Sequence, residues 1–247
     1  MTTTVTALYR YPIKSVGSEP VETVTLVEGQ TMPWDRTWAV THENSQADNT
    51  EWARCLNFLR VASSPALAAV RVTLDEAQSQ LTLRHPDRPE LTLCPDEDPQ
   101  ALVDWVGPLV AEGRAKATGV VRVPGRGMTD TDFPSISIAN TSTHRAVSQK
   151  LGQDMSMLRW RSNIWLDGLA PWEEIDLLGK DLQIGDATLH VAERIERCLN
   201  VQANPDTGHR DLAVLAALNT WGHQDFSMAA TVTRGGTVKV GDQVGVS

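Results

Sequence analysis

Between residues 182 and 189 the chain reads Leu182-Gln183-Ile184-Gly185-Asp186-Ala187-Thr188-Leu189. Apolar and polar side chains alternate on both sides of the Gly-Asp pair, and this period of two is typical of strands with one buried face. A Gly-Asp pair between two such strands favours a tight turn. The run Val238-Lys239-Val240-Gly241-Asp242-Gln243-Val244 has the same form. We therefore expect two strand–turn–strand units of the kind that build barrel walls.

The same alternation recurs through the chain, which predicts a mainly β protein with a few short helices. Further strands are expected at Val70–Leu74, Leu81–Arg84, Leu91–Leu93, Val121–Val123 and Leu189–Val191. One helix is predicted from a Thr141 or Ser142 cap to Gly152, with Val147 and Leu151 on one face. Another is predicted to begin at Asp211.

A division of the chain is expected where Pro124-Gly125-Arg126-Gly127 interrupts the strand pattern. We place an amino-terminal β-rich domain at residues 1–125 and a second domain at residues 126–247. The polar segments Asn44–Thr50 and Asp96–Pro99 are predicted to be surface loops.

The 247 residues can bury a full core, and the apolar and charged fractions of 41% and 21% are ordinary for a folded domain. The net charge of −9 argues against a nucleic-acid surface, because binding to phosphate backbones requires clustered Lys and Arg in excess. No export signal or membrane-spanning run is visible. Cys55, Cys94 and Cys198 are too few and too widely spaced for a disulfide framework, so we expect free thiols and a cytoplasmic protein.

The sequence around Cys198 is the best candidate for chemistry. The whole sequence lacks the motifs of zinc peptidases, serine hydrolases and P-loop nucleotide-binding proteins. Cys198 follows Arg197, and the turn Asn204-Pro205-Asp206-Thr207-Gly208 comes shortly after it. Nearby Arg194, Arg197 and Arg210 would favour a thiolate, the form that binds soft metals. From these residues alone, an inert buried cysteine with surface arginines is the alternative interpretation.

The stretch around Cys198 resembles the MOSC domain, the carboxy-terminal module of molybdenum-cofactor sulfurase. More closely, it is similar to enzymes that join this domain to an amino-terminal β-barrel domain, among them the mitochondrial amidoxime-reducing component and its bacterial relatives. Other segments are similar to family motifs in the same order, and Ser162 stands where the family usually has proline. These segments are Leu8-Tyr9-Arg10-Tyr11-Pro12-Ile13-Lys14-Ser15, Asp35-Arg36-Thr37-Trp38, Trp160-Arg161-Ser162-Asn163-Ile164 and Gly236-Thr237-Val238-Lys239-Val240-Gly241-Asp242.

The resemblance implies a molybdenum cofactor (molybdopterin), with Cys198 as the metal ligand and the catalytic thiolate. Molybdopterin carries a phosphate, so its pocket requires cations, hydroxyls and amides. We expect Trp34, Trp38, Trp160 and Trp165 to form core or pocket walls. The expected cofactor-binding residues are Lys14, Ser15, Arg36, Thr141, Ser142, Arg161, Asn163, Arg197 and Cys198. Taken singly, each also has a structural interpretation: a strand end for Lys14, salt bridges for Arg36 and Arg161, and caps for Thr141, Ser142 and Asn163.

The implied activity is reduction of N-hydroxylated small molecules. Electrons would come from a separate protein of ferredoxin, flavoprotein or cytochrome type, because no iron–sulfur motif follows the second domain. Asp132, Asp206 and His209 are acid–base candidates only through their proximity to these motifs. Pyridoxal phosphate binding is implied at the level of the family alone, and the large desulfurase domain of a complete sulfurase is absent. The alternatives are a sulfur carrier or cofactor-handling protein that uses Cys198, and a non-enzymatic barrel with an inert Cys198.

Overall fold

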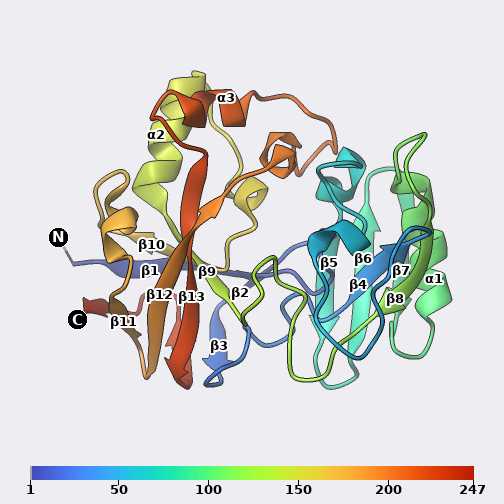
Figure 1. Cartoon of the computed structure of the whole chain (residues 1–247), viewed down its shortest axis with the longest axis horizontal. Coiled ribbons are helices and arrows are strands. Elements are labelled where there is room, and N and C mark those ends of the chain that lie inside the picture. Colours follow the sequence, from blue (N-terminus) through green and yellow to red (C-terminus); the bar gives the residue numbers. More distant parts are fainter. Residues whose placement is uncertain (1) are drawn as a thin grey trace.

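The computed structural model describes residues 2–247, and it is mainly β with a few short helices (Figure 1). The largest sheet has eight strands in the order β15-β11-β12-β13-β9-β10-β1-β2 and curls into half a barrel. These strands are β1 (Thr4–Arg10), β2 (Glu19–Val21), β9 (Ile136–Asn140), β10 (Ile164–Asp167), β11 (Asp181–Ile184), β12 (Ala187–Glu196), β13 (Asp225–Arg234) and β15 (Val244–Val246).

Strands from both ends of the chain belong to this layer. β1 pairs antiparallel with β10 in this sheet, and β3 (Thr23–Leu26) pairs with β14 (Gly236–Lys239) in a separate two-stranded sheet. The Val244 amide donates to the Thr3 carbonyl at 2.9 Å, so that β15 also lies beside the start of β1. The edge strand β15 therefore contacts the start of β1, and both termini lie on the same side of the molecule in Figure 1.

Both predicted Gly-Asp units are confirmed as a strand, a turn and a second strand, but only the first is a hairpin. In the first, Ile184 pairs with Ala187 across Gly185-Asp186, and β11 and β12 form a hairpin. In the second, β14 and β15 flank Gly241-Asp242 but do not pair with each other, because β14 pairs with β3 and β15 with β11. The turn between them redirects the chain between two strand partners.

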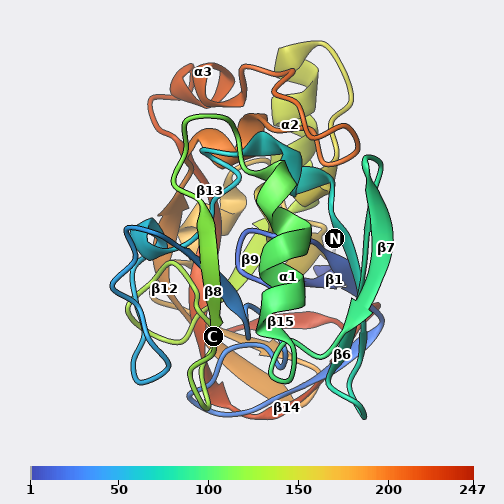
Figure 2. The same cartoon turned by 90° about the vertical axis from the view of Figure 1, so that its right-hand side faces the viewer.

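The remaining strands lie on the right of Figure 1, beside the half barrel. The predicted strand at Val121–Val123 is displaced: β8 ends at Val121, because the Arg122 amide donates to the side chain of Asn49 instead of continuing the ladder. Figure 2 shows α1 (Pro99–Val106) between β8 and β7. These strands are β4 (Ala39–His42) and β8 (Ala117–Val121), which pair, and β5 (Arg71–Asp75), β6 (Gln80–His85) and β7 (Arg88–Leu93), which confirm three predicted strands.

Two main apolar cores result. One fills the half barrel, and it takes Val5, Leu8, Val24 and Leu26 from the amino-terminal strands. The other is built from residues 13–109 with Ala203. A smaller core contains Trp160 and Trp165, and it lies beside α2. Trp38, Trp160 and Trp165 are fully buried, as expected of wall residues.

The helix predicted to end at Gly152 is confirmed as α2 (Thr141–Leu151), although its cap is Asn140, whose side chain accepts from the Ser142 amide. The second predicted helix begins three residues late, as α3 (Val214–Asn219). Helix α1 was not predicted. No helix within residues 2–247 is both long and apolar enough to cross a bilayer. The short 3-10 helices are η1 (Cys55–Asn57), η2 (Pro65–Ala69), η3 (Gly107–Leu109), η4 (Met157–Trp160), η5 (Glu173–Leu177) and η6 (Leu199–Gln202).

Candidate functional site

A cavity of about 300 Å³ opens at the carboxy-terminal end of β12. Such a volume suits a ligand of small-molecule size. Its walls come from four segments of the chain that are far apart in sequence. They are Arg36, then Thr129, Asp130, Thr131, Ser135 and Ser137, then Arg161 and Asn163, and finally Glu193, Arg194, Ile195, Glu196 and Arg197.

Consecutive residues at the end of β12 and just after it, from Glu193 to Arg197, line the cavity. The pairing of β12 with β13 is interrupted between Val191 and Glu193 and again between Arg194 and Glu196. Such irregularities break the alternation of a strand and redirect its side chains. Glu193, Arg194 and Glu196 are exposed at the mouth, whereas Arg197 points inward.

Arg36 and Arg161 share one aromatic ring. The guanidinium carbon of Arg36 lies 5.1 Å from the centroid of Tyr11, and that of Arg161 lies 4.3 Å from it. The Tyr11 hydroxyl donates to the Ser162 carbonyl at 3.1 Å, and its amide donates to Asp35 at 2.8 Å. Cation–π contact and these bonds fix both guanidinium groups beside each other.

The donors of these arginines are directed largely at main-chain carbonyls. Arg36 donates to the Arg161 carbonyl at 3.0 Å, and Arg161 donates to the Gly17 carbonyl at 2.9 Å. Arg36 also pairs with the buried carboxylate of Asp35. Burial, reinforced by the charge of Arg36, lowers the pKa of Arg161 to about 10. Arg161 therefore remains charged at neutral pH, but without a buried carboxylate of its own.

Arg197 is held in the same way from the opposite wall. It donates to the Phe226 and Trp160 carbonyls, at 2.8 Å each, and its guanidinium lies 5.8 Å from the Trp160 ring. Burial lowers the pKa of Arg197 to about 10, and the neighbouring Cys198 opposes this effect. Arg197 is thus the third guanidinium at the cavity, and the groups to which it donates are uncharged.

Lys14 reaches the cavity through Asp130. Its buried ammonium donates to the Met128 carbonyl at 2.7 Å and to Asp130 at 2.5 Å. Burial lowers the pKa of Lys14, and the Asp130 carboxylate offsets this only in part. Ser15 is adjacent in sequence but does not line the cavity.

Three of the predicted residues have left-handed backbones. The φ angles are 61° at Ser15, 52° at Arg36 and 51° at Arg161. Such angles are uncommon outside glycine and occur where surrounding structure imposes them, often at functional sites. Here the Arg36 amide donates to the Tyr11 carbonyl at 2.7 Å, and Met128 donates back to the Arg36 carbonyl at 2.8 Å.

Asn163 and neighbouring hydroxyls supply uncharged donors and acceptors. The Asn163 amide oxygen accepts from the Ser137 hydroxyl at 2.9 Å, and its nitrogen donates to the Tyr9 carbonyl at 3.1 Å. Thr131 donates to Ser135 at 2.8 Å or to the Phe133 carbonyl at 2.7 Å. The cavity therefore presents both cations and hydroxyls.

Thr141 and Ser142 do not line this cavity. They occupy the first turn of α2, where Thr141 bonds Asp167, and Arg145 donates to both hydroxyls at 3.3 and 3.1 Å. The hydroxyls that do line it are those of Thr129, Thr131, Ser135 and Ser137, which sequence reasoning missed. The polar run just before β9 was the available signal.

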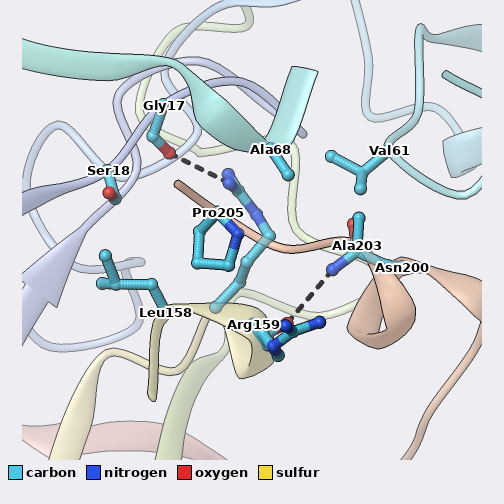
Figure 3. Close-up of a pocket in the computed structure, with 10 residues that line it drawn as sticks. Gly17, Ser18, Val61, Ala68, Leu158, Arg159, Asn200, Ala203 and Pro205 are labelled. Atoms are coloured by element: carbon cyan, nitrogen blue, oxygen red, sulfur yellow. Dashed lines mark hydrogen bonds between the residues drawn. The ribbon is translucent and has the colours of Figure 1, made fainter. Parts of the chain in front are cut away.

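Cys198 is an exposed free thiol beside Arg197, and it too lies outside the cavity lining. The segment after it is anchored firmly. Arg71 pairs with Asp206 at 2.7 Å, and Arg210 donates to the Ala62 carbonyl at 2.5 Å. Figure 3 shows Asn200, Ala203 and Pro205 packed around a void of only about 10 Å³ beside Gly17 and Val61. There is little room for this segment to shift.

Two family descriptions match this chain. The MOSC N-terminal beta barrel domain matches residues 2–105, and the MOSC domain matches residues 128–245. The chain is a MOSC-domain protein. MOSC domains resemble the carboxy-terminal module of molybdenum-cofactor sulfurase, which associates this MOSC protein with molybdenum-cofactor chemistry.

Similar solved structures include the YUAD protein from Bacillus subtilis, which is 14% identical, with a TM-score of 0.49 over 100% of this chain and 96% of that one. YiiM from Geobacillus stearothermophilus is 17% identical, with a TM-score of 0.35 over 45% of this chain and 53% of that one. No curated protein matches the sequence.

The departure from the family pattern at Ser162 has a local partner in this MOSC protein. The Ser162 hydroxyl is fully buried, lies 2.7 Å from that of Ser227, and accepts from Arg197 at 3.4 Å. Ser227 has a φ of 71°. Where a proline offers no side-chain bond, this serine links β13 to the cavity arginine.

Proposed function

We propose that this MOSC protein holds a molybdenum cofactor in the cavity and, with Cys198 as the metal ligand, reduces N-hydroxylated small molecules. The charge balance of the cavity's inner wall is the observation that carries this proposal. Lys14, Arg36, Arg161 and Arg197 place four cations at or just behind this wall against the two carboxylates of Asp35 and Asp130, while Glu193, Arg194 and Glu196 lie exposed at the mouth of the cavity. Buried cations without counterions are costly, so the wall favours an anionic ligand such as the phosphate of molybdopterin.

The protein's part in the reaction would be binding and orientation. Arg36, Arg161 and Arg197 would hold the anionic end, Asn163 and the cavity hydroxyls would bond polar groups, and the Cys198 thiolate would bind the metal. When bound, the cofactor supplies two-electron redox chemistry at the metal. In the overall reaction the N–O bond of the substrate breaks, and two electrons from a separate donor protein with two protons yield the amine-type product and water.

A test is to measure molybdenum content and the reduction of a simple N-hydroxyamidine in protein expressed with cofactor supply. Cys198→Ala should lose activity by roughly a hundredfold or more, because the thiolate ligand is gone. Cys55→Ala and Cys94→Ala are matched controls and should retain both metal and activity. Equal activity in Cys198→Ala and wild type would exclude the thiolate role.

The exposure of Cys198 outside the cavity favours a second candidate, a sulfur-carrying or cofactor-handling role. An exposed thiol can accept and pass on a persulfide sulfur. Wild type that binds cofactor without reducing N-hydroxyamidine, and that carries a persulfide on Cys198 by mass spectrometry, would support this role. Protein that binds no cofactor would leave the non-enzymatic barrel.

A further inference from the structure

The two carboxylates in the cationic wall differ in how they are held. Asp35 is fully buried, and its carboxylate accepts from the Tyr11 amide while pairing with Arg36. The side chain of Asp130 is 75% exposed. Within residues 2–247, its carboxylate has a single hydrogen-bond partner, the ammonium of Lys14. Asp35 is therefore part of the framework, whereas Asp130 can swing away at the cost of one contact.

Asp130 also lies within the electrostatic reach of the cavity arginines. It lines the cavity with Arg36 and Arg161. Desolvation alone would raise the pKa of Asp130, but Lys14, Arg36 and Arg161 together outweigh it and lower that pKa. The carboxylate is consequently ionised at neutral pH, and it occupies the region to which the cations attract negative charge.

Lys14 can exchange this partner for another. An ammonium has three donors, and one of them is fixed on the Met128 carbonyl. An anion oxygen that replaced Asp130 would restore the charge-assisted bond and leave the Met128 contact in place. The loop that carries Asp130 is itself held at its base, because Gly127 donates to Thr31 at 3.0 Å and a side chain at Gly127 would lie 2.1 Å from the Asp35 carbonyl. Only the carboxylate has to move.

We propose that Asp130 is an internal counterion, which an entering phosphate group displaces from Lys14, so that Asp130 weakens anion binding and weakens it more for doubly charged anions than for singly charged ones. The displaced carboxylate stays beside the cavity, where it repels a dianion more strongly than a monoanion. This inference rests on the proposed function only in that both place an anionic group in the cavity.

The test is calorimetric titration of wild type, Asp130→Asn and Asp132→Asn with inorganic phosphate, and then with nitrate, at low salt. Asparagine keeps an oxygen for Lys14 but removes the charge. Asp130→Asn should bind phosphate about tenfold or more tightly than wild type, with a smaller gain for nitrate. Asp132→Asn, an exposed carboxylate two residues along the same loop, should change either affinity less than about twofold.

Thermal unfolding provides a second measurement for a variant that is less stable. Because a ligand stabilises the folded state more when its concentration is higher relative to its Kd, phosphate should raise the Tm of Asp130→Asn by more than it raises that of wild type. The gain should vanish in a Lys14→Met background.

Two results would overturn the inference in distinguishable ways. Phosphate binding by wild type that is equal to or tighter than binding by Asp130→Asn would show that Asp130 orders Lys14 instead of competing with the anion, and the anion site would stand. Absence of phosphate binding by both proteins would remove the anion site itself, and with it the proposed cofactor pocket.

Discussion

His144 is a buried ionisable residue on the face of α2 that packs against the aromatic core. The Trp160 indole donates to its Nδ1 at 2.9 Å, and the Trp165 ring meets it edge-on at 5.7 Å. Burial lowers the pKa of His144 to about 4. The imidazole is therefore neutral in the folded protein over the range in which an exposed histidine becomes charged.

This residue should make stability depend on pH. Between about pH 6.5 and pH 4, His144 is protonated in the unfolded chain but stays neutral in the folded one. The contribution of this residue to the free energy of unfolding is therefore fully present above pH 6.5 and is lost as the pH falls. The loss is up to about 3 kcal/mol. Urea unfolding at pH 7 and pH 4.5 measures it, with His144→Asn as the comparison because asparagine keeps an acceptor for Trp160. An identical pH dependence in both proteins would rule out this residue as the cause.

At the same scale, the structure brings only part of the predicted site residues to one cavity. Arg36, Arg161, Asn163 and Arg197 lie in segments that resemble family motifs, and all four line one cavity. Thr141 and Ser142 are expected at the cofactor only because similar family segments approach it there. Which end of β9 faces the cavity depends on its pairing with β10 and β13, and a single sequence does not contain that information.

The turn after Cys198 depends on Gly208. Its φ is 70°, and an added Cβ would lie 2.8 Å from the Ala66 Cα. The Asn204 side chain accepts from the Asp206 amide at 2.8 Å, which confirms the turn predicted from Asn204-Pro205-Asp206-Thr207-Gly208. Through Gly208, this turn packs the segment after Cys198 against Ala66, which belongs to the surroundings of the core built from residues 13–109.

Gly208→Ala should therefore destabilise the protein more than a left-handed glycine alone would explain. Gly29 is the matched control, because its φ is also 70° and nothing lies within 4 Å of an added Cβ. We expect about 1 kcal/mol for Gly29→Ala and about 2 to 3 kcal/mol for Gly208→Ala, measured by urea unfolding. Equal losses would mean that the segment yields to the added methyl group.

Local sequence patterns predicted where helices and strands form more reliably than they predicted which strands pair. The α2 helix and three strands beside the half barrel followed from periodicity and caps. Helix α1 was missed although Asp98 caps it and Pro99 begins it, because the short polar segment before it was interpreted as a loop. The second Gly-Asp unit has the predicted strands and turn, but the pattern does not show that these strands pair elsewhere, since the partners of β14 and β15 are more than 50 residues away in sequence.

At the scale of the whole molecule, the predicted division at residue 125 separates strands that pair in the structure. A fragment of residues 126–247 would lack β1, which pairs with β10, and β3, which pairs with β14. We expect this fragment to unfold without cooperativity and to bind a hydrophobic dye, because the half-barrel core would be open. Co-expression with residues 1–125 should restore a cooperative thermal transition. A cooperative transition of the fragment alone would support an autonomous second domain.

The bonds that connect β1 with β15 have a consequence for the order of the chain. Because Val244 donates to Thr3, the first and last strands are neighbours, and the path of the backbone is nearly a ring. In such a ring, the chain ends could lie at another position while the arrangement of the strands stays the same. A covalent bridge between these neighbours, with new ends opened in the largely exposed loop at Asn44–Thr50, would leave every strand pairing of the half barrel as it is.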